Sequence, residues 1–358
     1  MYCLYICAHK TTQMYRLFKP LLFTFLITAL SATQACGQAA PLDGAAERIM
    51  FYNTENLFDT IDDPLTDDKE FLPSGKMNWT ADKYNTKLAH ITQVVEAGGF
   101  PILVGLCEVE NKSVLNDLVK QPALAAKDYA FIHFDSPDER GIDVALIYQS
   151  SKFKVLASKS IPIVFDKEPD DKTRDILYVK GEVNGEVIHV FVNHWPSRSE
   201  GVEKTAPRRH NAANAVRIAV DSIFAVDKDA QIIIMGDLND HPEDLSLTFW
   251  LKALPSDSKK TDNSLYNLAD VFAKQGKGTH KYKGEWGTLD QIIVSRALFD
   301  KKGLYTKTDA AKVGEFDFLL SDDPKGGKWT NRTYAGDKYL GGYSDHLPVY
   351  LNLYLGKK

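Results

Sequence analysis

The sequence predicts an α/β fold, built from layers of β-sheet and helix, for residues 46–357 of the chain. Short apolar segments of strand length alternate along the chain with longer segments whose apolar residues recur at helical spacing. Several of the strand segments are apolar throughout, which is typical of sheets that are covered on both faces. Because no repeat or low-complexity linker interrupts this order, we expect one domain.

The strands are expected where β-branched, aromatic and other apolar residues form short runs that end in turn-forming or polar residues. The first two runs are apolar almost without interruption, so both are expected to be buried strands. In order along the chain, the expected strands lie at residues 48–53, 102–107, 129–134, 142–148, 187–193, 231–236, 289–295 and 347–355.

The helices are expected where apolar residues recur every three or four positions. Residues 82–97 place Tyr84, Leu88, Ile91 and Val95 on one face in this way. The same spacing predicts a short helix at 114–119 and a longer one at 208–224. Two segments without periodicity, which are rich in Asp, Gly, Lys and Pro, are expected to be surface loops at 59–79 and 321–343.

The N-terminal segment has the order of a secretory signal peptide. The basic residues Arg16 and Lys19 precede an apolar run at 21–30, and small residues follow it. The run is too short for a comfortable membrane-spanning helix. We therefore expect residues 1–36 to be an N-terminal extension and signal peptide, and the protein to be exported as a periplasmic, secreted or outer-membrane protein.

Two features of this end stay open. Met14 directly precedes the basic residues and makes a better start than Met1, so residues 1–13 are a candidate upstream extension. Cys36 follows the apolar run, as the lipid-bearing cysteine of a bacterial lipoprotein does, although residues 33–35 match the usual context loosely. Cleavage nearby and lipid attachment at Cys36 are both kept, and the lipid would be the one link to a membrane.

The net charge gives no support to nucleic-acid binding, and the cysteine content argues against a disulfide framework. The net charge is −5, and beyond residue 36 the chain carries 40 basic and 48 acidic residues, whereas nucleic-acid-binding proteins usually have a basic surplus. Because Cys3, Cys7 and Cys36 lie in or at the edge of the extension, no disulfide framework is expected. The remaining Cys107, in an apolar run, is expected to be a buried structural thiol.

Polar residues stand at the ends of the expected strands. Because polar groups at strand ends converge on one rim of a sheet, they are candidates for a common site. They are Asn53 and Glu55, Glu108 and Glu110, Asn193 and His194, Asp237, Asn239 and Asp240, Asp290, and Ser344, Asp345 and His346.

These residue types suit a hard divalent cation next to a phosphate. Glu108 and Asp345 offer carboxylate oxygens and Asn53 an amide oxygen, a mixture that favours Mg²⁺ or Mn²⁺ over zinc. His194 and His346 are suited to protonate a leaving oxygen or to stabilise charge on a phosphate.

Each residue also has a structural alternative. Asp237 and Asn239, two apart on a turn, are suited to orient a water and a phosphoryl oxygen, but acids and amides after strands also cap helices and make turns. For Glu55 or Asp240 taken alone, a structural role is favoured. Asp290 differs, because a buried carboxylate needs a partner, and a histidine is the obvious one.

Six short motifs occur along the chain in an order that resembles the endonuclease/exonuclease/phosphatase superfamily, the DNase I-like proteins, over residues 48–355. The resemblance implies a four-layer α/β/β/α sandwich in which two mixed β-sheets are flanked by helices. The motifs are N-x-E at 53–55, G-L-C-E at 105–108, N-H at 193–194, G-D-L-N at 236–239, L-D at 289–290 and S-D-H-L-P at 344–348.

The resemblance implies a role for each matching residue. Asn53 and Glu108 correspond to the positions that bind the divalent metal, and Asp345 to an additional ligand. Asp237 corresponds to the residue that orients or activates the attacking water. Asn239 corresponds to one that contacts the scissile phosphate.

The two histidines correspond to distinct positions of the superfamily. His346 matches the histidine next to the phosphate, supported by the carboxylate of Asp290. His194 resembles the second histidine of the DNase I branch, an acid near the leaving group, and Asp143 is the candidate carboxylate behind it. Glu55 lies where some relatives carry an acid near the metal, and it is a secondary candidate.

Two loops bear on the substrate. N-H-W-P-S-R at 193–198 with a downstream arginine pair resembles the bacterial secreted nuclease branch, and Asn193, Arg198 and Arg209 are candidates for binding phosphate or substrate. The loop at 324–343 interleaves basic and aromatic residues, which suits nucleic acid. The alternative, solvated loops with a few packing aromatics, stays open.

The resemblance implies hydrolysis of phosphodiesters by in-line attack of water, with Mg²⁺ or Mn²⁺ as cofactor and no covalent enzyme intermediate. The leading hypothesis is an extracytoplasmic endonuclease that acts as a monomer on DNA or RNA, without a stable protein partner. The first alternative is a phosphatase or phospholipid phosphodiesterase, of the inositol phosphate or sphingomyelinase kind. The second is a catalytically silent binding protein on the same fold.

Overall fold

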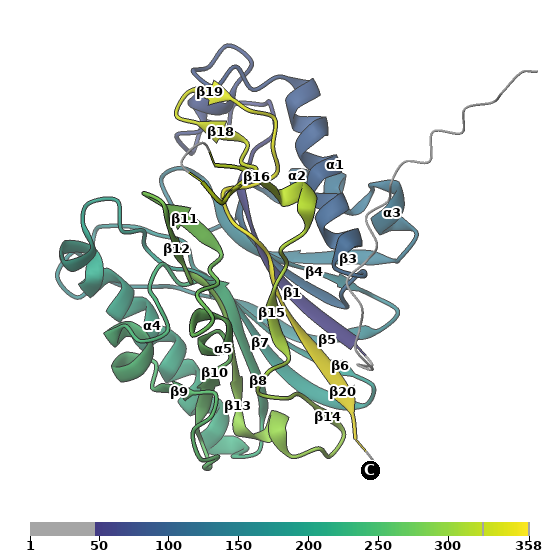
Figure 1. The fold of residues 1–358 in the computed structure, drawn as a ribbon, viewed down its shortest axis with the longest axis vertical. Coiled ribbons are helices and arrows are strands. Elements are labelled where there is room, and N and C mark those ends of the chain that lie inside the picture. Colours follow the sequence, from purple (N-terminus) through teal and green to yellow (C-terminus); the bar gives the residue numbers. More distant parts are fainter. Residues whose placement is uncertain (1–46, 324–325, 357–358) are drawn as a thin grey trace, which may run out of the picture. The chain divides into compact units, whose positions relative to one another are not determined.

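A computed structural model describes residues 47–323 and 326–356 (Figure 1). The chain divides into two units, Met1–Cys36 and Gly37–Lys358, and the described residues belong to the second. The predicted signal peptide, with Cys36, therefore lies outside the described residues. Within the described ranges, no helix has the length and apolar character needed to cross a membrane.

The first of two large sheets is built around the parallel pair β1 (Glu47–Leu57) and β2 (Leu103–Val109). On either side, β20 (Val349–Leu355) pairs antiparallel with β1 and β4 (Asp143–Gln149) pairs antiparallel with β2. The strand order is β14-β20-β1-β2-β4-β3, and β15 also pairs with β20. The remaining strands are β3 (Tyr129–His133), β14 (Leu304–Tyr305) and β15 (Ala311–Val313).

The second sheet is built around another parallel pair, β7 (Glu186–His194) and β8 (Gln231–Asp237), with β13 (Asp290–Ser295) antiparallel to β8. The strand order is β5-β6-β7-β8-β13-β10-β9. Both sheets mix parallel and antiparallel pairs, so the prediction of two mixed sheets is confirmed. The remaining strands are β5 (Phe153–Ile161), β6 (Ile176–Val183), β9 (Ala253–Pro255) and β10 (Leu265–Asn267).

Helices cover the outer faces of both sheets, which gives the four predicted layers (Figure 1). The first sheet is covered by α1 (Ala81–Ala97), α2 (Lys112–Val119) and α3 (Pro122–Ala125), and the second by α4 (Val202–Val226). The short helices are α5 (Asp270–Ala273) and the turns Lys69–Phe71, Ser246–Trp250, Arg296–Phe299 and Asp317–Leu319. Three hairpins pair β11 (His280–Tyr282) with β12 (Glu285–Gly287), β16 (Leu320–Asp322) with β17 (Lys328–Thr330), and β18 (Tyr334–Ala335) with β19 (Lys338–Tyr339).

The central strands are apolar throughout because each of their faces is buried in a different core. On β8, Ile233 and Met235 belong to the core between the sheets, whereas Ile232 and Ile234 belong to the core under α4. Successive strand residues point to opposite faces, so alternate residues reach different layers. Cys107 is buried in the core between the sheets, and its predicted role as a buried thiol is confirmed.

Every predicted helix and strand is present, with shifts at its ends. The largest shift concerns the helix predicted at 208–224, which begins earlier, at Val202. The sequence missed β5 and β6, because β5 is a largely exposed edge strand and β6 alternates buried and partly exposed residues. Neither forms a continuous apolar run. The segment 321–343, predicted to be a loop, contains short hairpin strands.

Candidate active site

The polar strand ends meet at one rim of the two sheets, as predicted. The parallel strands β1, β2, β7 and β8 end there, and the antiparallel strands β13 and β20 begin there. Across three neighbouring strands, His194 pairs in register with Asp237, and Asp237 with Asp290. Gly236 permits this close pairing, because a Cβ at that position would lie 2.5 Å from the carbonyl oxygen of Asn193.

The rim opens into a cleft of about 470 Å³. Its lining includes residues that the sequence predicted as a group: Glu108, His194, Asp237, Asn239 and His346. Its other lining residues were not predicted: Arg140, Arg174, Ser197 and Ser199. The cleft therefore combines carboxylates, imidazoles and guanidinium groups, which is the composition expected for chemistry on an anionic ester.

Asp237 occupies the centre of the group and is almost fully buried. Its Oδ1 accepts a hydrogen bond of 3.0 Å from the backbone of Asn239, and its Oδ2 accepts one of 3.1 Å from Asn53 Nδ2. The Nε2 atoms of His194 and His346 each lie 3.8 Å from the same Oδ2. The carboxylate is thus fixed between the two imidazoles.

Burial raises the pKa of Asp237 to about 7. The positive charge of His346 opposes this shift, while the negative charges of Asp290 and Glu108 add to it. A carboxylate with a pKa close to neutrality is suited to accept a proton from an attacking water.

His346 is held by Asp290, and this predicted contact is confirmed. Their Nδ1 and Oδ2 atoms are 2.7 Å apart, and Asp290 is fully buried. Burial by itself would lower the pKa of His346, but the carboxylates of Asp290 and Asp237 hold that pKa well above its usual value. His346 is therefore a cation at the floor of the cleft, where negative charge develops on a phosphate.

His194 has the opposite character. Burial lowers its pKa well below the usual value, and the positive charges of Arg174 and Arg140 lower it further. The imidazole is therefore neutral at neutral pH. The cleft therefore contains two histidines in different protonation states, neutral His194 and positively charged His346.

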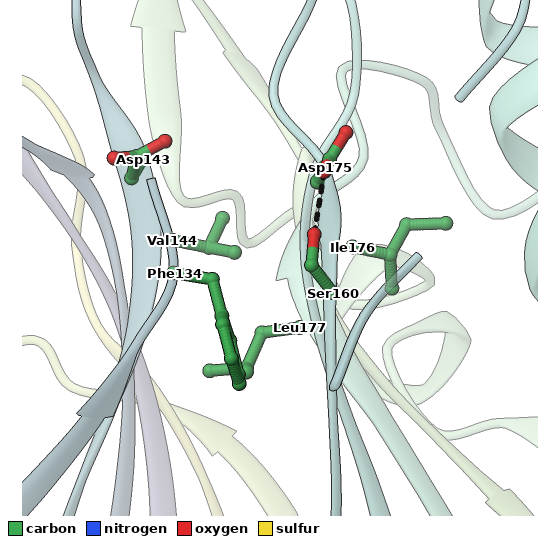
Figure 2. Close-up of a pocket in the computed structure, with 7 residues that line it drawn as sticks. All are labelled: Phe134, Asp143, Val144, Ser160, Asp175, Ile176 and Leu177. Atoms are coloured by element: carbon green, nitrogen blue, oxygen red, sulfur yellow. Dashed lines mark hydrogen bonds between the residues drawn. The ribbon is translucent and has the colours of Figure 1, made fainter. Parts of the chain in front are cut away.

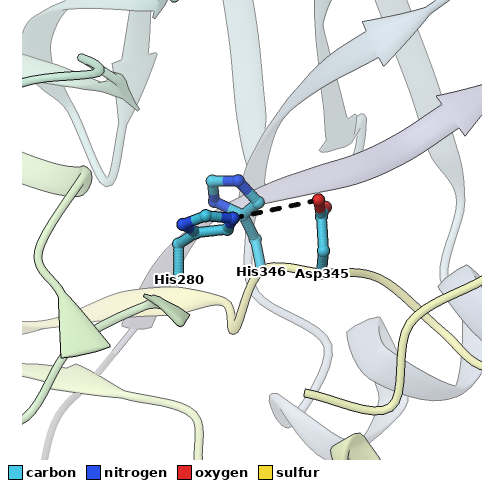
Figure 3. A group of neighbouring side chains, drawn as sticks. All are labelled: His280, Asp345 and His346. Atoms are coloured by element: carbon cyan, nitrogen blue, oxygen red, sulfur yellow. Dashed lines mark ion pairs between the residues drawn. The ribbon is translucent and has the colours of Figure 1, made fainter. Parts of the chain in front are cut away.

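His280, which the sequence did not single out, lies beside this group. Figure 3 shows its ring next to that of His346, with Nε2 directed at Asp345; the ring centres are 4.7 Å apart and Nε2 lies 4.0 Å from Asp345 Oδ2. Burial, with the charge of His346, lowers the pKa of His280 to about 4. No signal pointed to His280, because it belongs to a short hairpin strand rather than to an end of an apolar run.

Glu108 is the predicted metal ligand that faces the cleft. Its backbone has a φ of +58°, which residues other than glycine seldom adopt, at the point where β2 ends. Its Oε2 accepts a hydrogen bond of 3.0 Å from the backbone of Asn56, and its Oε1 lies 3.9 Å from His194 Nε2. The turn therefore directs a partly exposed carboxylate into the site.

Asn53 contacts two carboxylates of the site through its amide nitrogen. Its Oδ1 accepts a hydrogen bond of 2.9 Å from the backbone of Glu55, so its Nδ2, not its oxygen, faces Asp237 and Glu108 at 3.1 and 3.4 Å. The side chain orients two carboxylates by donating to both. Its role as a direct metal ligand stays a prediction.

Asp345 and Glu55 lie in a charged network beside the cleft. Arg332 joins them, with its Nη2 3.0 Å from Asp345 Oδ2 and its Nε 3.4 Å from Glu55 Oε1. The buried Lys87 is attracted by Glu55, Asp345 and Glu108, which oppose the lowering of its pKa to about 8 by burial. The carboxylates of Glu55, Asp345 and Glu108 therefore all lie near the Lys87 ammonium group.

The residues present fit a divalent cation. Glu108 and Asp345 offer carboxylate oxygens of the kind that Mg²⁺ and Mn²⁺ prefer, and Glu108 faces an open cleft. Two sets of histidine and carboxylate groups around His346 also have ligand atoms close enough together to share an ion. Cations of this kind would offset the concentration of negative charge around Asp237.

Asp143 does not support His194, so that prediction is wrong. It accepts hydrogen bonds of 2.9 Å from His133 Nε2 and from the backbone of Ser136. Figure 2 shows it across a small gap from Asp175, at a pocket that does not include His194. The Nδ1 atom of His194 is buried without a hydrogen-bond partner. The sequence could not show that His133, ten residues upstream, forms the hydrogen bond with Asp143.

Asn193 also has a structural role, not the predicted role in binding substrate. It is fully buried. Its Nδ2 donates to the carbonyl of Met235, and its Oδ1 accepts from Trp195 Nε1. Both halves of the amide are therefore used in joining β7 to β8 and in fixing the turn after β7.

The two arginines predicted to bind substrate are held by acids. Arg209 is fully buried, and its Nε lies 2.7 Å from Asp240 Oδ1. Arg198 Nη2 lies 2.8 Å from the same oxygen and 2.6 Å from Asp244 Oδ2. Neither lines the cleft. The structure contradicts the prediction that they bind phosphate, because Asp240, which was expected to be structural, pairs with both and Asp244 pairs with Arg198 as well.

Replacing Arg209 tests this structural role. Arg209→Ala leaves a cavity and deprives buried Asp240 of one of its two guanidinium partners. We expect the free energy of unfolding to fall by about 3 kcal/mol, as measured by urea denaturation, with kcat/KM of the folded fraction little changed. The adjacent Arg208, whose acidic partners are partly exposed, is the matched control, and Arg208→Ala should cost at most about 1 kcal/mol. A stable Arg209→Ala variant with weakened substrate binding would contradict the assignment.

The loops predicted to contact nucleic acid offer fewer free cations than expected. Lys204 pairs with Glu200, and Lys328 pairs with Asp322. Tyr334 is buried, packs on Trp79 and donates from its hydroxyl group to the carbonyl of Met77. The alternative of paired charges and packing aromatics therefore describes much of both loops, and the cations of the cleft come from Arg140 and Arg174 instead.

Fold and site together define a hydrolase of phosphate esters. The model of the Endonuclease/Exonuclease/phosphatase family matches residues 48–355, and the chain belongs to this family. Enzymes of this family generally use a divalent metal ion. The prediction of the superfamily from the six motifs is thereby confirmed.

Solved structures share the fold at low sequence identity. A mannosyl-6-phosphatase from Bacteroides thetaiotaomicron is 17% identical, with a TM-score of 0.55, and the match covers 86% of this chain and 99% of that one. TDP2 from D. rerio, in complex with a single-strand DNA product, is 16% identical with a TM-score of 0.53 and coverages of 86% and 98%. The human Nocturnin catalytic domain, with bound sulfate, is 17% identical with a TM-score of 0.52 and coverages of 86% and 94%. No curated protein matches the chain in sequence.

Proposed function

We propose that the protein is an exported phosphodiesterase that cleaves nucleic acid with the help of Mg²⁺ or Mn²⁺. The observation that carries the proposal is the grouping of Asp237, His346 and His194 around one cleft that also contains Glu108 and two arginines. A water held by Asp237 attacks phosphorus in line with the leaving oxygen, and no covalent enzyme intermediate forms. The protein acts as a monomer, without a stable protein partner.

The chain's own residues have separate tasks in this reaction. Asp237 orients the water and accepts its proton, because burial has brought its pKa close to neutrality. His346, kept positively charged by Asp290, stabilises charge on the phosphoryl oxygens. His194 lies at the cleft wall beside the two arginines, the position proposed for the leaving group.

The divalent ion would be held by Glu108, with Asp345 as the second carboxylate. When bound, such an ion offsets negative charge on the phosphoryl oxygens. The uncommon backbone conformation of Glu108 supports this assignment, since a site residue is held in it by the surrounding structure.

A phosphatase of small phosphorylated molecules is the second candidate. It is favoured by the limited volume of the cleft, about 470 Å³, and by the ion pairs of Lys204 with Glu200 and of Lys328 with Asp322 in the two neighbouring loops. The fold accommodates this chemistry too, since a mannosyl-6-phosphatase shares it. Neither argument depends on the metal.

A substrate panel tests the proposal. Purified protein is incubated with Mg²⁺ and, separately, with plasmid DNA, RNA, a sugar phosphate, an inositol phosphate and sphingomyelin. We expect nicking of plasmid or cleavage of RNA, and complete loss of this activity in EDTA with recovery on adding Mn²⁺. Release of inorganic phosphate from a monoester, without cleavage of nucleic acid, would favour the second candidate. No hydrolysis of any substrate, and no binding of Mn²⁺ in a titration, would favour a catalytically silent binding protein.

The proposed export has its own test. Expression of the full chain in a bacterium, followed by N-terminal sequencing of the processed protein, should place the mature end close to Cys36. Mass spectrometry then separates plain cleavage from a lipid on Cys36. An unprocessed protein that stays in the cytoplasm would contradict export.

A further inference from the structure

Two arginines on the wall of the cleft have no part in the reaction described above. Arg140 lies in the segment before β4, and Arg174 lies just before β6. Both line the cleft together with Ser197 and Ser199, which follow β7. Segments far apart in the sequence therefore bring two guanidinium groups and two hydroxyl groups to one side of the site.

Arg174 is buried but incompletely paired. It is 8% exposed. Its Nη1 donates to Asp138 Oδ2 and its Nη2 to the carbonyl of Trp195, both at 2.9 Å. Its Nε is buried without a hydrogen-bond partner. A buried donor without an acceptor is costly, so this atom is available to an acceptor from a ligand.

Arg140 adds a second and more accessible charge. Its side chain is 54% exposed, and its Nε lies 3.9 Å from Asp138 Oδ1. Asp138 is thus the ion-pair partner of both Arg140 and Arg174. One carboxylate against two guanidinium groups leaves a surplus of positive charge on this wall, in a region otherwise crowded with acids.

The two arginines lie on the side of the cleft formed by His194. Arg174 Nη2 donates at 2.9 Å to the carbonyl of Trp195, the residue after His194, and Arg140 lines the same cleft as His194. The Nε2 atom of His194 lies 3.8 Å from Asp237 Oδ2, and His346 Nε2 lies 3.8 Å from the same oxygen, where the scissile phosphate is proposed to bind. The arginines therefore face whatever is attached to that phosphate next to His194.

We propose that Arg140 and Arg174, with the hydroxyl groups of Ser197 and Ser199, bind a second phosphate group of the substrate, attached on the His194 side of the scissile phosphate. The inference rests on the proposed function and narrows its substrate class. Phosphodiesters that carry a neighbouring phosphate, as oligonucleotides do, satisfy the unpaired Nε of Arg174. Esters with a single phosphate leave it unpaired.

Short dinucleotides test the subsite. We compare the hydrolysis of d(TpT), d(pTpT) and d(TpTp), which share one internal diester and differ in a terminal phosphate. We expect one of the two terminal phosphates to raise kcat/KM about tenfold or more, since a charge-assisted pair with arginine is among the stronger hydrogen bonds. The terminus that has this effect identifies the side of the diester that faces His194.

Arg140 carries the mutational test, because its exposed side chain can be removed without stranding a buried acid. Arg140→Ala should reduce the preference for the terminal phosphate, measured as the ratio of kcat/KM with and without it, to nearly one. Arg140→Lys should restore part of the preference, since it keeps the charge but not the planar fork. Arg296→Ala, which removes a partly exposed arginine in the turn after β13, is the matched control and should keep the wild-type preference.

The possible outcomes distinguish a failure of the proposed subsite from a failure of the proposed function. If the wild type hydrolyses all three dinucleotides equally well, the subsite is refuted and the phosphodiesterase stands. If none is hydrolysed, binding is measured in EDTA, where no turnover occurs. Tighter binding of one phosphorylated dinucleotide than of d(TpT), lost in Arg140→Ala, then supports the subsite although the proposed reaction fails. Equal binding of all three dinucleotides overturns the subsite.

Discussion

Asp237→Asn is expected to lower kcat by about 10³-fold or more and to leave the fold intact. The substitution removes the group that orients the water and accepts its proton, and it changes the side-chain volume very little. The backbone of Asn239 can still donate to the Oδ1 of the new side chain, so the turn after β8 is retained. The measurement is the initial rate on the preferred substrate with saturating Mg²⁺.

The control for this prediction is a second exchange of aspartate for asparagine. Asp257 is largely exposed, pairs with Lys274 and does not line the cleft. Asp257→Asn should therefore have wild-type activity and a similar thermal midpoint. The thermal midpoint of Asp237→Asn should stay close to that of the wild type, because removal of a carboxylate disfavoured by burial offsets the loss of the hydrogen bond from Asn53 Nδ2 to Oδ2. Wild-type activity of Asp237→Asn would contradict the proposed role of Asp237 in orienting the water and accepting its proton.

His346→Ala is expected to lower kcat by about 10²- to 10³-fold. The imidazolium is lost from the position where charge develops on the phosphoryl oxygens, and water is a weaker substitute. The fully buried carboxylate of Asp290 also loses its partner, so some loss of stability accompanies the loss of rate. Rates are therefore compared well below the unfolding temperature of each variant.

A double-mutant cycle shows whether His346 and Asp290 act as a unit. Asp290→Asn should cost less than His346→Ala, because the neutral amide still orients the ring while its charge is lost. The double variant should be no slower than His346→Ala alone, since a positioning residue acts only through its partner. His210→Ala, on α4 and stacked on Trp250, is the matched control and should keep full activity. Additive losses in the double variant would contradict a common role.

The central strands could be predicted from the sequence because burial on both faces requires a continuous apolar run. A strand covered on both faces must be apolar at every position, so β1, β2, β7 and β8 were recognisable without knowledge of their neighbours. β5 and β6 were missed for the same reason. The edge strand β5 is largely exposed and the inner strand β6 alternates buried and partly exposed residues, so neither contains a continuous apolar run.

The candidate site was predictable in part. Polar residues at the ends of buried strands indicated the position of the rim. The order of the motifs identified Glu108, Asp237 and His346 as site residues. The pair of His346 with Asp290 was also predictable, because a carboxylate inside an apolar strand needs a partner. Arg140 and Arg174 were not, since each lies in a polar segment that looks like any other loop.

What the sequence by itself determined is the series of central strands and helices, the rim where strands end and the residue types gathered there, because these follow from local runs and spacings of apolar and polar residues. The four layers were implied by the resemblance to the superfamily. Only the tertiary structure decided which side chain meets which. It turned the amide of Asn53 toward two carboxylates, gave Asp143 to His133 instead of His194, and placed Arg209 against Asp240. Contacts between residues far apart in the chain are fixed by packing and by competition among several possible partners, and no local pattern records the outcome of that competition.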